Sequence, residues 1–370
     1  MKVLHCVPSL TGGGAERQLT YLAKALVQIG CDVHVAYVHG GPNLQRLETS
    51  GATLHRIAAF GNHDPQILWR LFSTIRKIDP DIVQCWLLQM EVLGGLASLL
   101  TRTPWVFSER SCEDAYPPSL KTWLRTRMGL LATAIVANSE GGERYWLAQG
   151  QERRRCHIIR NGLPLDEIGK APMATVEEAG VTAGEPLVLY AGRFGLEKNL
   201  EALLRAIGLV ATSHPARTIF CGDGPLRNQI ENLVRQNGLD QRVRILGYAS
   251  NLWSLMKRAN VVASVSRFEG TPNVVLEGMA CRCPLVVSDI PAHRELLDEE
   301  AAILVDPRDP RRIADAIIDV IDNPERAAQR AQVAYERVQR YSLPAIARQY
   351  ADLYKELALT GGRQLTRVAS

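Results

Sequence analysis

The sequence predicts an α/β protein built from two Rossmann-like, doubly wound parallel sheets. Short apolar segments alternate along the chain with amphipathic helical segments, which is the βαβ rhythm of a parallel sheet. The rhythm stops once, over residues 162–186, and then resumes. The chain has 370 residues, which is more than a single hydrophobic core usually serves, so two domains are expected.

The first domain is expected to span residues 1–163. Its first strand, KVLHCV, precedes a helix at about residues 15–29 and the strand DVHVAYV. The segment QILWRLFSTIRKI repeats apolar residues every three or four positions, as an amphipathic helix does. Further strands are predicted in TLHRI, DIVQCW, WVFS, AIVANS and CHIIRN.

The second domain is expected to span residues 164–342, after a junction near residues 161–164. Its strands are predicted in LVLYAG, RTIFCGDG, VRILGY, VVASVS, PLVVSD and AILVDP. The segment SLPAIARQYADLYKEL is one amphipathic helix, expected to end near Leu357, with no strand after it. The remaining tail, GGRQLTRVAS, is expected to be disordered.

Composition excludes several classes of protein. The formal net charge of +4 is too small for a typical nucleic-acid-binding protein. No apolar run reaches the roughly 18 residues of a membrane span, and the start of the chain is typical of a strand rather than a signal peptide. The eight cysteines lack a paired spacing, which favours reduced thiols and a cytoplasmic protein.

The basic residues are unevenly distributed. Residues 1–163 hold 18 Lys and Arg against 13 Asp and Glu, whereas the remainder holds 25 against 26. One interpretation is random scatter. The other is a surface that faces anionic lipid or an acceptor carrying a pyrophosphate.

Two glycine-rich turns follow predicted strands. In SLTGGGAERQL, Gly13 and Gly14 allow a ligand to approach the backbone at a helix start, although a plain turn is the alternative. The dinucleotide fingerprint fits poorly, because Arg17 stands where its third glycine is required. The second turn, CGDGP, contains Gly222 and is by itself a weak signal.

The loop AGRFGLEKN places Arg193 and Lys198 after the first strand of the second domain. Cations at the carboxyl end of a parallel strand suit a diphosphate. The alternative is that both are solvated charges that pair with Glu197 or Glu201.

The segment RFEGTPNVVLEGMACRCPLVVSD contains two glutamates, Glu269 and Glu277, with seven residues between them. Thr271 is predicted to cap a helix, with Pro272 in its first turn. The first amides of this helix could bind phosphates. Glu269 precedes the helix, where it can meet a sugar, and Glu277 lies within it, where it can accept hydrogen bonds from a ribose diol.

These motifs, in their order along the chain, resemble the GT4 family of retaining glycosyltransferases, a large bacterial group with the GT-B fold. The resemblance covers nearly the whole chain. It rests on TGGGAE, on VANS with IIRNG, and on AGRFGLEKN, GDGP, LGY and FEGTPNVVLEGMACRCPLVVSD. The last of these is the most specific, with the E-x7-E spacing. The resemblance implies two Rossmann-like domains that face a central crevice, with the acceptor on the first domain and a nucleotide sugar on the second. Residues 343–370 are expected to form a C-terminal helix that crosses back to the first domain, followed by the tail.

The resemblance also implies roles for individual residues. Arg193 and Lys198 match the pair that binds the donor diphosphate, Glu269 matches the contact to the donor sugar, and Glu277 matches the contact to the ribose. The remaining donor-binding residues that it implies are Gly13, Gly14, Gly222, Leu246, Gly247, Tyr248, Gly270, Thr271, Pro272, Asn273 and Val274.

One position departs from the family pattern. Many relatives have a histidine near the reacting sugar, where WVFSERSCED has Arg110. Arg110 is therefore expected to act at the catalytic site, on the donor sugar, the phosphate or an anionic acceptor, and Glu109 is a weaker candidate. The family implies front-face displacement without an established carboxylate nucleophile. No metal or other cofactor is expected, and the DPD at residues 79–81 is interpreted as a turn.

The expected donor is a UDP-sugar, and the expected acceptor is a lipid-linked glycan or a polysaccharide. The alternatives are a GDP-mannose-dependent mannosyltransferase, a nucleotide-sugar epimerase and a non-catalytic sugar-nucleotide-binding protein. A phosphorylase would need a lysine for pyridoxal phosphate, and no candidate is found. The segment PPSLKTWLRTRMGLLA has cations beside Trp123 and Leu124. It predicts either a helix on the inner face of the cytoplasmic membrane or a core helix with a basic outer face.

Overall fold

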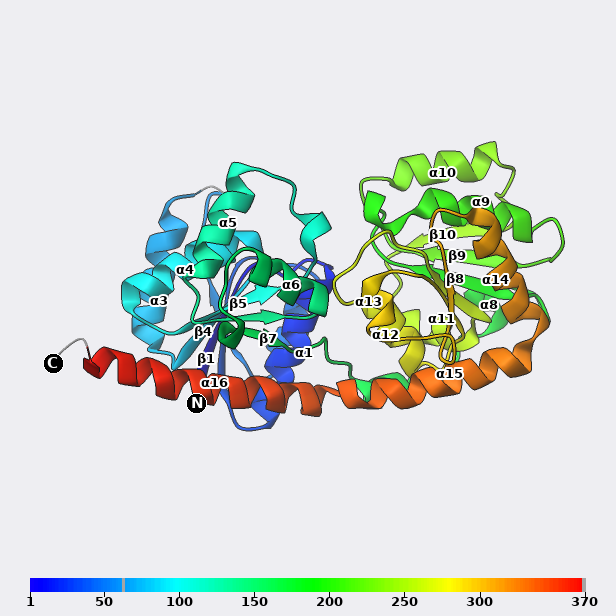
Figure 1. Cartoon of the computed structure of the whole chain (residues 1–370). Coiled ribbons are helices and arrows are strands. Elements are labelled where there is room, and N and C mark those ends of the chain that lie inside the picture. Colours follow the sequence, from blue (N-terminus) through cyan, green and yellow to red (C-terminus); the bar gives the residue numbers. More distant parts are fainter. Residues whose placement is uncertain (62–63, 368–370) are drawn as a thin grey trace. The chain divides into compact units, whose positions relative to one another are not determined.

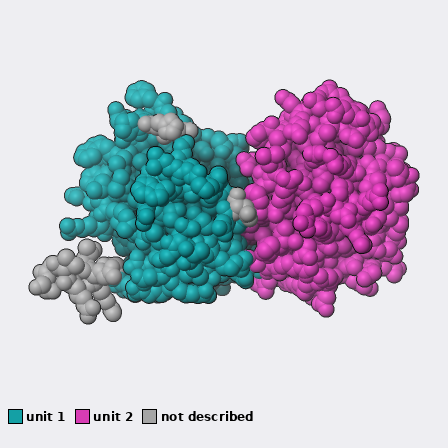
Figure 2. Space-filling view, turned by 45° about the horizontal axis from the view of Figure 1, so that its top comes forward, with its two compact units in different colours: residues 1–163, 341–370 teal, residues 164–340 magenta. Residues whose placement is uncertain are grey.

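The computed structural model describes residues 1–61 and 64–367. The chain divides into two compact units (Figure 2): residues 1–163 together with 341–370 form unit 1, and residues 164–340 form unit 2. Each unit contains one parallel sheet with helices on both faces, so the predicted fold class is confirmed.

Unit 1 contains a seven-stranded sheet in the order β3-β2-β1-β4-β5-β6-β7, and every paired strand is parallel. The strand residues are largely buried, as expected of a sheet covered on both faces. The strands are β1 (Lys2–Ser9), β2 (Asp32–His39), β3 (Thr53–Arg56), β4 (Ile82–Trp86), β5 (Trp105–Glu109), β6 (Ala134–Ala137) and β7 (Cys156–Ile158).

The helices of unit 1 cover both faces of its sheet (Figure 1). From β1 the strand order runs outwards in both directions, and right-handed crossovers then place the helices on opposite faces. Helices α3, α4 and α5 pack in sequence on one face, and α1 packs with α16 on the other. The helices are α1 (Gly14–Gln28), α2 (Leu44–Glu48), α3 (Gln66–Ile78), α4 (Leu87–Thr101), α5 (Leu120–Leu130), α6 (Glu140–Ala148) and α16 (Leu343–Arg367), with 3-10 turns at Glu113–Ala115 and Arg153–Arg155.

Unit 2 contains a six-stranded parallel sheet in the order β10-β9-β8-β11-β12-β13. Helices α9 and α14 pack against each other and contribute to its core. The strands are β8 (Leu187–Ala191), β9 (Arg217–Cys221), β10 (Val243–Gly247), β11 (Val261–Ser264), β12 (Leu285–Ser288) and β13 (Ile303–Val305). The helices are α7 (Leu165–Lys170), α8 (Val176–Ala179), α9 (Leu200–Val210), α10 (Arg227–Gln236), α11 (Leu252–Arg258), α12 (Asn273–Ala280), α13 (Pro291–Arg294), α14 (Pro310–Asp322) and α15 (Pro324–Val338), with 3-10 turns at Leu196–Lys198 and Gln339–Tyr341.

The last helix, α16, lies on unit 1. It begins beside the end of the N-terminal segment, where Leu163 and Ser342 form a parallel bridge and Leu343 N donates to Leu163 O at 3.0 Å. Further along α16, the Tyr354 hydroxyl donates to the Gln84 side chain in β4. The helix continues to Arg367, ten residues beyond the expected end near Leu357, so the expectation of a disordered tail is wrong up to that residue. Residues 368–370 of the expected tail lie outside the described residues.

Candidate functional site

In unit 2 the loop after β8 carries the two predicted diphosphate-binding cations. It passes through the 3-10 turn at Leu196–Lys198 and reaches Asn199, whose φ of 55° is left-handed and is tolerated by asparagine. The Asn199 side chain donates to the backbone oxygens of Val265 and Pro307, at 3.2 and 2.6 Å. These bonds fix the loop against the ends of β11 and β13.

The two cations have different surroundings. The guanidinium of Arg193 pairs with Glu197 at 2.8 Å, and its side chain is 66% exposed. From the sequence, such a solvated pair with Glu197 was the alternative to diphosphate binding by Arg193. Lys198 instead lies in a partly buried position, and its side chain is 18% exposed. The pairing of Lys198 with Glu201 does not occur, since Glu201 bonds to Arg205.

Lys198 meets the first glutamate of the E-x7-E motif. Its Nζ donates to Glu269 Oε1 at 2.5 Å, and the Ser266 hydroxyl donates to the same oxygen at 2.7 Å. Burial by itself would raise the pKa of Glu269, but the Lys198 charge and the two hydrogen bonds hold that pKa below its usual range. Glu269 is therefore an ionised carboxylate at neutral pH, oriented by two donors.

A buried histidine in α13, the short helix after β12, supports this cluster. Nδ1 of His293 lies 2.7 Å from Ser288 O, which assigns the proton to Nδ1. The Ser288 hydroxyl donates to Ser266 O at 2.6 Å and so connects β12 to the loop that carries Glu269. Burial lowers the pKa of His293, which keeps the ring neutral. Ser266 and His293 were missed from the sequence, because their relevance depends on strand order.

The second glutamate is inside α12. Glu277 is only 1% exposed, and its Oε1 accepts a hydrogen bond from Trp253 Nε1 at 3.2 Å. The predicted cap of this helix is wrong by one residue. Pro272, not Thr271, occupies the cap position, and the helix begins at Asn273. Pro272 has an extended ψ of 99°, so it ends the loop instead of forming the first helical turn.

The remaining predicted donor-binding residues of unit 2 lie in the loop before α12, in the first turn of α12 and at the ends of β9 and β10. Gly222 N donates to Gly247 O at 2.6 Å, and a Cβ on Gly222 would lie 1.9 Å from the backbone oxygen of Gly192. Glycine is therefore required sterically where β8, β9 and β10 end side by side. Leu246 is half-buried beside Gly247, and Tyr248 is 66% exposed. Gly270, Thr271 and Pro272 are buried, and Asn273 and Val274 are half-buried at the start of α12.

In unit 1 the glycine turn is covered by a carboxylate. Gly13 precedes α1, and a Cβ at this position would lie 2.1 Å from Oε2 of Glu16, so a larger residue would displace the Glu16 carboxylate. Oε1 of Glu16 accepts hydrogen bonds from Thr11 at 2.9 Å and Ser9 at 3.4 Å. Gly14 is the first residue of α1. The acidic group at this helix start was not singled out from the sequence, although it belongs to the quoted TGGGAE motif.

Arg110 follows β5 in unit 1 and is held by three contacts. Its guanidinium lies 4.3 Å from the centre of the Trp86 ring and donates to the hydroxyl of Tyr350 at 2.7 Å and to Asn161 at 3.4 Å. A cavity of about 10 Å³, close to the room of one water molecule, adjoins these residues. Burial, with a smaller effect of the Arg110 charge, lowers the pKa of the neighbouring His5 to about 3.

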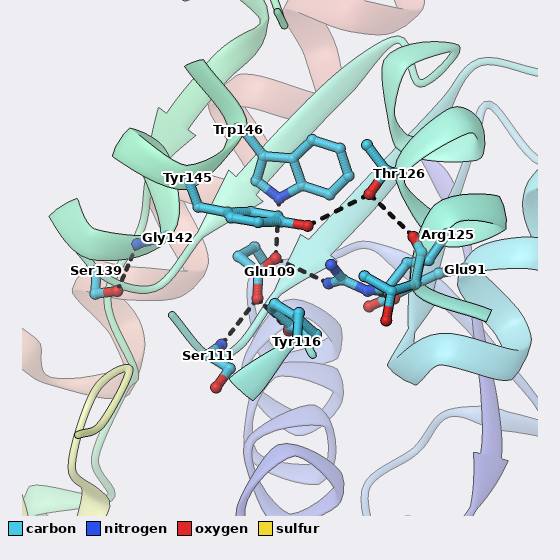
Figure 3. Close-up of polar contacts among 11 residues, drawn as sticks. Glu91, Glu109, Ser111, Tyr116, Arg125, Thr126, Ser139, Gly142, Tyr145 and Trp146 are labelled. Carbon is cyan, nitrogen blue, oxygen red and sulfur yellow. Dashed lines mark hydrogen bonds and ion pairs between the residues drawn. The ribbon is translucent and has the colours of Figure 1, made fainter. Parts of the chain in front are cut away.

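Glu109, the weaker catalytic candidate, is a buried structural carboxylate (Figure 3). It is fully buried and accepts hydrogen bonds from Ser111 N, the Tyr116 hydroxyl, Arg125 and the Trp146 indole, at 2.6 to 2.9 Å. The expectation that it contacts a ligand is therefore wrong, because its oxygens are turned to internal donors.

Arg125 joins Glu109 to a second buried acid. It donates to Glu91 at 2.6 Å and to Glu109 at 2.8 Å, and its guanidinium is only 1% exposed. Burial raises the pKa of Glu91 to about 7, against the lowering effect of Arg125. One arginine lies between two acids, and the negative charge of Glu109 also raises the pKa of Glu91.

Comparison with known proteins identifies the family. The family described as Glycosyl transferases group 1 matches residues 175–337, and the one described as Glycosyltransferase Family 4 matches residues 12–167. The putative glycosyltransferase EpsF of Bacillus subtilis is 32% identical over 309 residues, which cover 78% of this chain and 79% of that protein. The chain belongs to the GT4-type glycosyltransferases.

One further relative and one solved structure match almost the whole chain. The lipopolysaccharide core biosynthesis glycosyltransferase LpsD of Rhizobium meliloti is 26% identical over 361 residues, which cover 96% of this chain and 98% of that protein. The solved structure of Anabaena HepE in complex with UDP and glucose has a TM-score of 0.86 at 20% identity and covers 96% of this chain and 100% of that chain. The fold is therefore GT-B. Among the described residues, no helix is both long and apolar enough to cross a membrane.

Proposed function

We propose that this glycosyltransferase moves a hexose or N-acetylhexosamine from a UDP-sugar to a lipid-linked or polysaccharide acceptor, in bacterial cell-surface glycan synthesis. The contact between Lys198 and Glu269 carries the proposal. This contact places a cation that can bind a diphosphate beside an ionised carboxylate that can accept hydrogen bonds from sugar hydroxyls. Both side chains are partly accessible, so a ligand can reach them.

The donor is held by unit 2. Lys198 and Arg193 bind the diphosphate, Glu269 accepts hydrogen bonds from the sugar, and Glu277 accepts them from the ribose. The first amides of α12 lie next to Glu269 in the chain and add partial positive charge toward the phosphates. Arg193 exchanges its solvated contact with Glu197 for the ligand, which costs little because exposed pairs are weak.

Transfer proceeds with retention of the anomeric configuration by front-face displacement. The bond from the sugar to the β-phosphate oxygen breaks, the acceptor oxygen attacks on the same face, and the departing phosphate takes the acceptor's proton. Lys198 stabilises the charge that develops on the diphosphate. Glu269 orients the sugar instead of attacking it, because Lys198 and Ser266 already donate to its Oε1. Arg110 is a further catalytic residue of this proposal, and no metal ion is required.

Several observations support the choice of donor and acceptor. HepE, a structural neighbour, was solved with UDP and glucose. LpsD is named for lipopolysaccharide core biosynthesis, and lipopolysaccharide is a lipid-linked glycan. The excess of basic residues in the first 163 residues suits an anionic membrane. We therefore place the enzyme in the cytoplasm, at the inner face of the cytoplasmic membrane.

Thermal unfolding with UDP, GDP or ADP tests the donor assignment, because ligand bound to the native state raises the melting temperature. We expect UDP to raise it, and Lys198→Ala to weaken the effect. A shift with GDP alone would redirect the proposal to GDP-mannose. A folded sample that responds to none of the three would contradict the assignment of Glu269 and Glu277.

Turnover with EDTA tests the role of metal. We expect the rate to be unchanged. A rate that disappears with EDTA and returns with magnesium would overturn the metal-free mechanism.

A further inference from the structure

The outer face of α5 is an exposed apolar stripe. Trp123 and Leu124 lie three and four residues after Leu120 on α5. Leu131, the C-cap residue, lies seven residues after Leu124, so the four share one side of the helix. Their exposed fractions are 79%, 53%, 40% and 57%. A stripe this long is unlike the scattered single apolar residues of an ordinary protein surface.

The opposite face of α5 is firmly attached to unit 1, so the stripe is not the result of an undocked helix. Arg125, Met128 and Gly129 are buried, and Arg125 is bonded to the two buried acids. A Cβ on Gly129 would lie 2.0 Å from the ring of Trp146, which shows how closely the helix packs. The packing of the buried side of α5 therefore determines which of its side chains face outward.

The neighbouring helix extends the apolar surface. α4 packs against α5 (Figure 1), and Leu99 and Leu100 in its last turn are 38% and 57% exposed. We call these six residues, three on α5, Leu131 at its C-cap and two on α4, the apolar face of unit 1.

The exposed charges of helices α3, α4 and α5 have one sign. Helices α3, α4 and α5 contain a single acid, Glu91, which is buried and bonded to Arg125. Their other charged residues are the cations Arg70, Arg76, Lys77, Lys121 and Arg127, and Arg102 directly follows α4. The side chains of Lys121 and Arg127 are exposed on α5 itself, and the Arg127 guanidinium lies 5.6 Å from the Trp123 ring. The exposed acids Asp79 and Asp81 follow α3, and the exposed Glu113 precedes α5.

We propose that the apolar face of unit 1 docks on an anionic lipid bilayer. Leucine and tryptophan side chains enter the boundary between head groups and acyl chains, and the nearby cations contact anionic head groups. A lipid surface fits better than a protein partner, because α3, α4 and α5 offer cations without any exposed acid for reciprocal ion pairs. This inference rests on the proposed function, in which the acceptor is lipid-linked and is met at the membrane.

Sedimentation with vesicles tests the proposal. The full chain is mixed with vesicles of phosphatidylglycerol and phosphatidylcholine, or of phosphatidylcholine alone, and the bound fraction is measured. We expect binding to the anionic vesicles that falls at least tenfold in the triple variant Leu120→Ser, Trp123→Ser, Leu124→Ser. The control Met173→Ser, at an exposed apolar residue of unit 2, should bind like the unaltered protein.

The contribution of charge is tested separately. The double variant Lys121→Glu, Arg127→Glu keeps the apolar stripe and should lose most binding to the anionic vesicles. Equal binding by the unaltered protein and both α5 variants would overturn the proposal. So would a concentration-dependent dimer that the triple variant abolishes in the absence of vesicle binding, because the face would then be a protein interface.

Failure of this inference is distinguishable from failure of the proposed function. The triple variant should keep the unaltered melting temperature and its increase with UDP, because none of the changed residues lies in unit 2. If UDP stabilises both proteins but vesicles bind neither, the donor assignment survives and the docking face is wrong. If vesicles bind and UDP has no effect, the docking face survives and the donor assignment is wrong.

Discussion

Arg110 and Tyr350 are 240 residues apart in the sequence, and the guanidinium of the first donates to the hydroxyl of the second at 2.7 Å. The bond ties the loop after β5 to the C-terminal helix α16. Arg110 also packs on Trp86 in β4, so one side chain joins three elements of unit 1. Its side chain has a structural role in unit 1 whatever it does in catalysis.

Removing the Tyr350 hydroxyl should loosen α16. Tyr350→Phe keeps the ring but leaves a charged donor without its acceptor, which should cost roughly 1–3 kcal/mol of unfolding free energy. Hydrogen exchange is the measurement, and amides in residues 343–357 should exchange faster. Tyr335→Phe, on α15 of unit 2, is the control. Unaltered exchange along α16 would show that the contact does not hold the helix.

Replacing Lys198 should reduce turnover more than donor affinity. Lys198→Ala removes the cation that stabilises the departing diphosphate, and kcat should fall roughly a hundredfold or more. Steady-state kinetics with the donor identified by thermal unfolding provide the measurement. Lys170→Ala, an exposed lysine on α7, should leave kcat unchanged. A Lys198→Ala enzyme with normal kcat would remove this residue from the phosphate site.

The Glu277 carboxylate should determine nucleotide affinity. Glu277→Gln keeps the shape of the side chain but loses the charge that strengthens hydrogen bonds to a ribose, so the Kd for UDP should rise about tenfold or more. Titration calorimetry measures it. Glu231→Gln, on the exposed side of α10, should bind UDP normally. An unchanged Kd in Glu277→Gln would place the ribose elsewhere.

The buried Glu91 should make stability depend on pH near neutrality. The pKa of Glu91 is about 7 in the folded protein, against its usual value of 4.5. Between pH 4.5 and pH 7 the folded protein therefore binds a proton that the unfolded chain has lost, and the free energy of unfolding falls as the pH rises through this range. Glu91→Gln removes this penalty, which approaches about 3 kcal/mol at pH 8.

Unfolding measured from pH 5 to pH 8 tests this expectation. The free energy of unfolding of Glu91→Gln, relative to the unaltered protein, should increase toward pH 8. Glu140→Gln, at a half-exposed acid on α6, should show no such trend. A flat difference for Glu91→Gln would mean that Glu91 stays ionised beside Arg125 across this range.

Local sequence patterns predicted the elements well, because each depends on neighbours in the chain. The alternation of apolar segments marked the strands of both sheets, and the break after residue 162 separated the two sets of strands. The Gly-Pro loop between Glu269 and Glu277 correctly predicted a helix start, but not which residue caps it. That choice depends on the backbone angles of Pro272, which the loop around it determines.

The sequence by itself determined the fold class and the family, and the donor-binding residues that it suggests stay a prediction. The tertiary structure alone decided which of them meet. Lys198 reaches Glu269 across 71 residues. Arg125 of α5 is buried between two acids, while Trp123 of the same helix is exposed. Local periodicity cannot specify such contacts, because they arise from the order in which distant strands pair and from the cost of burying an unpaired charge.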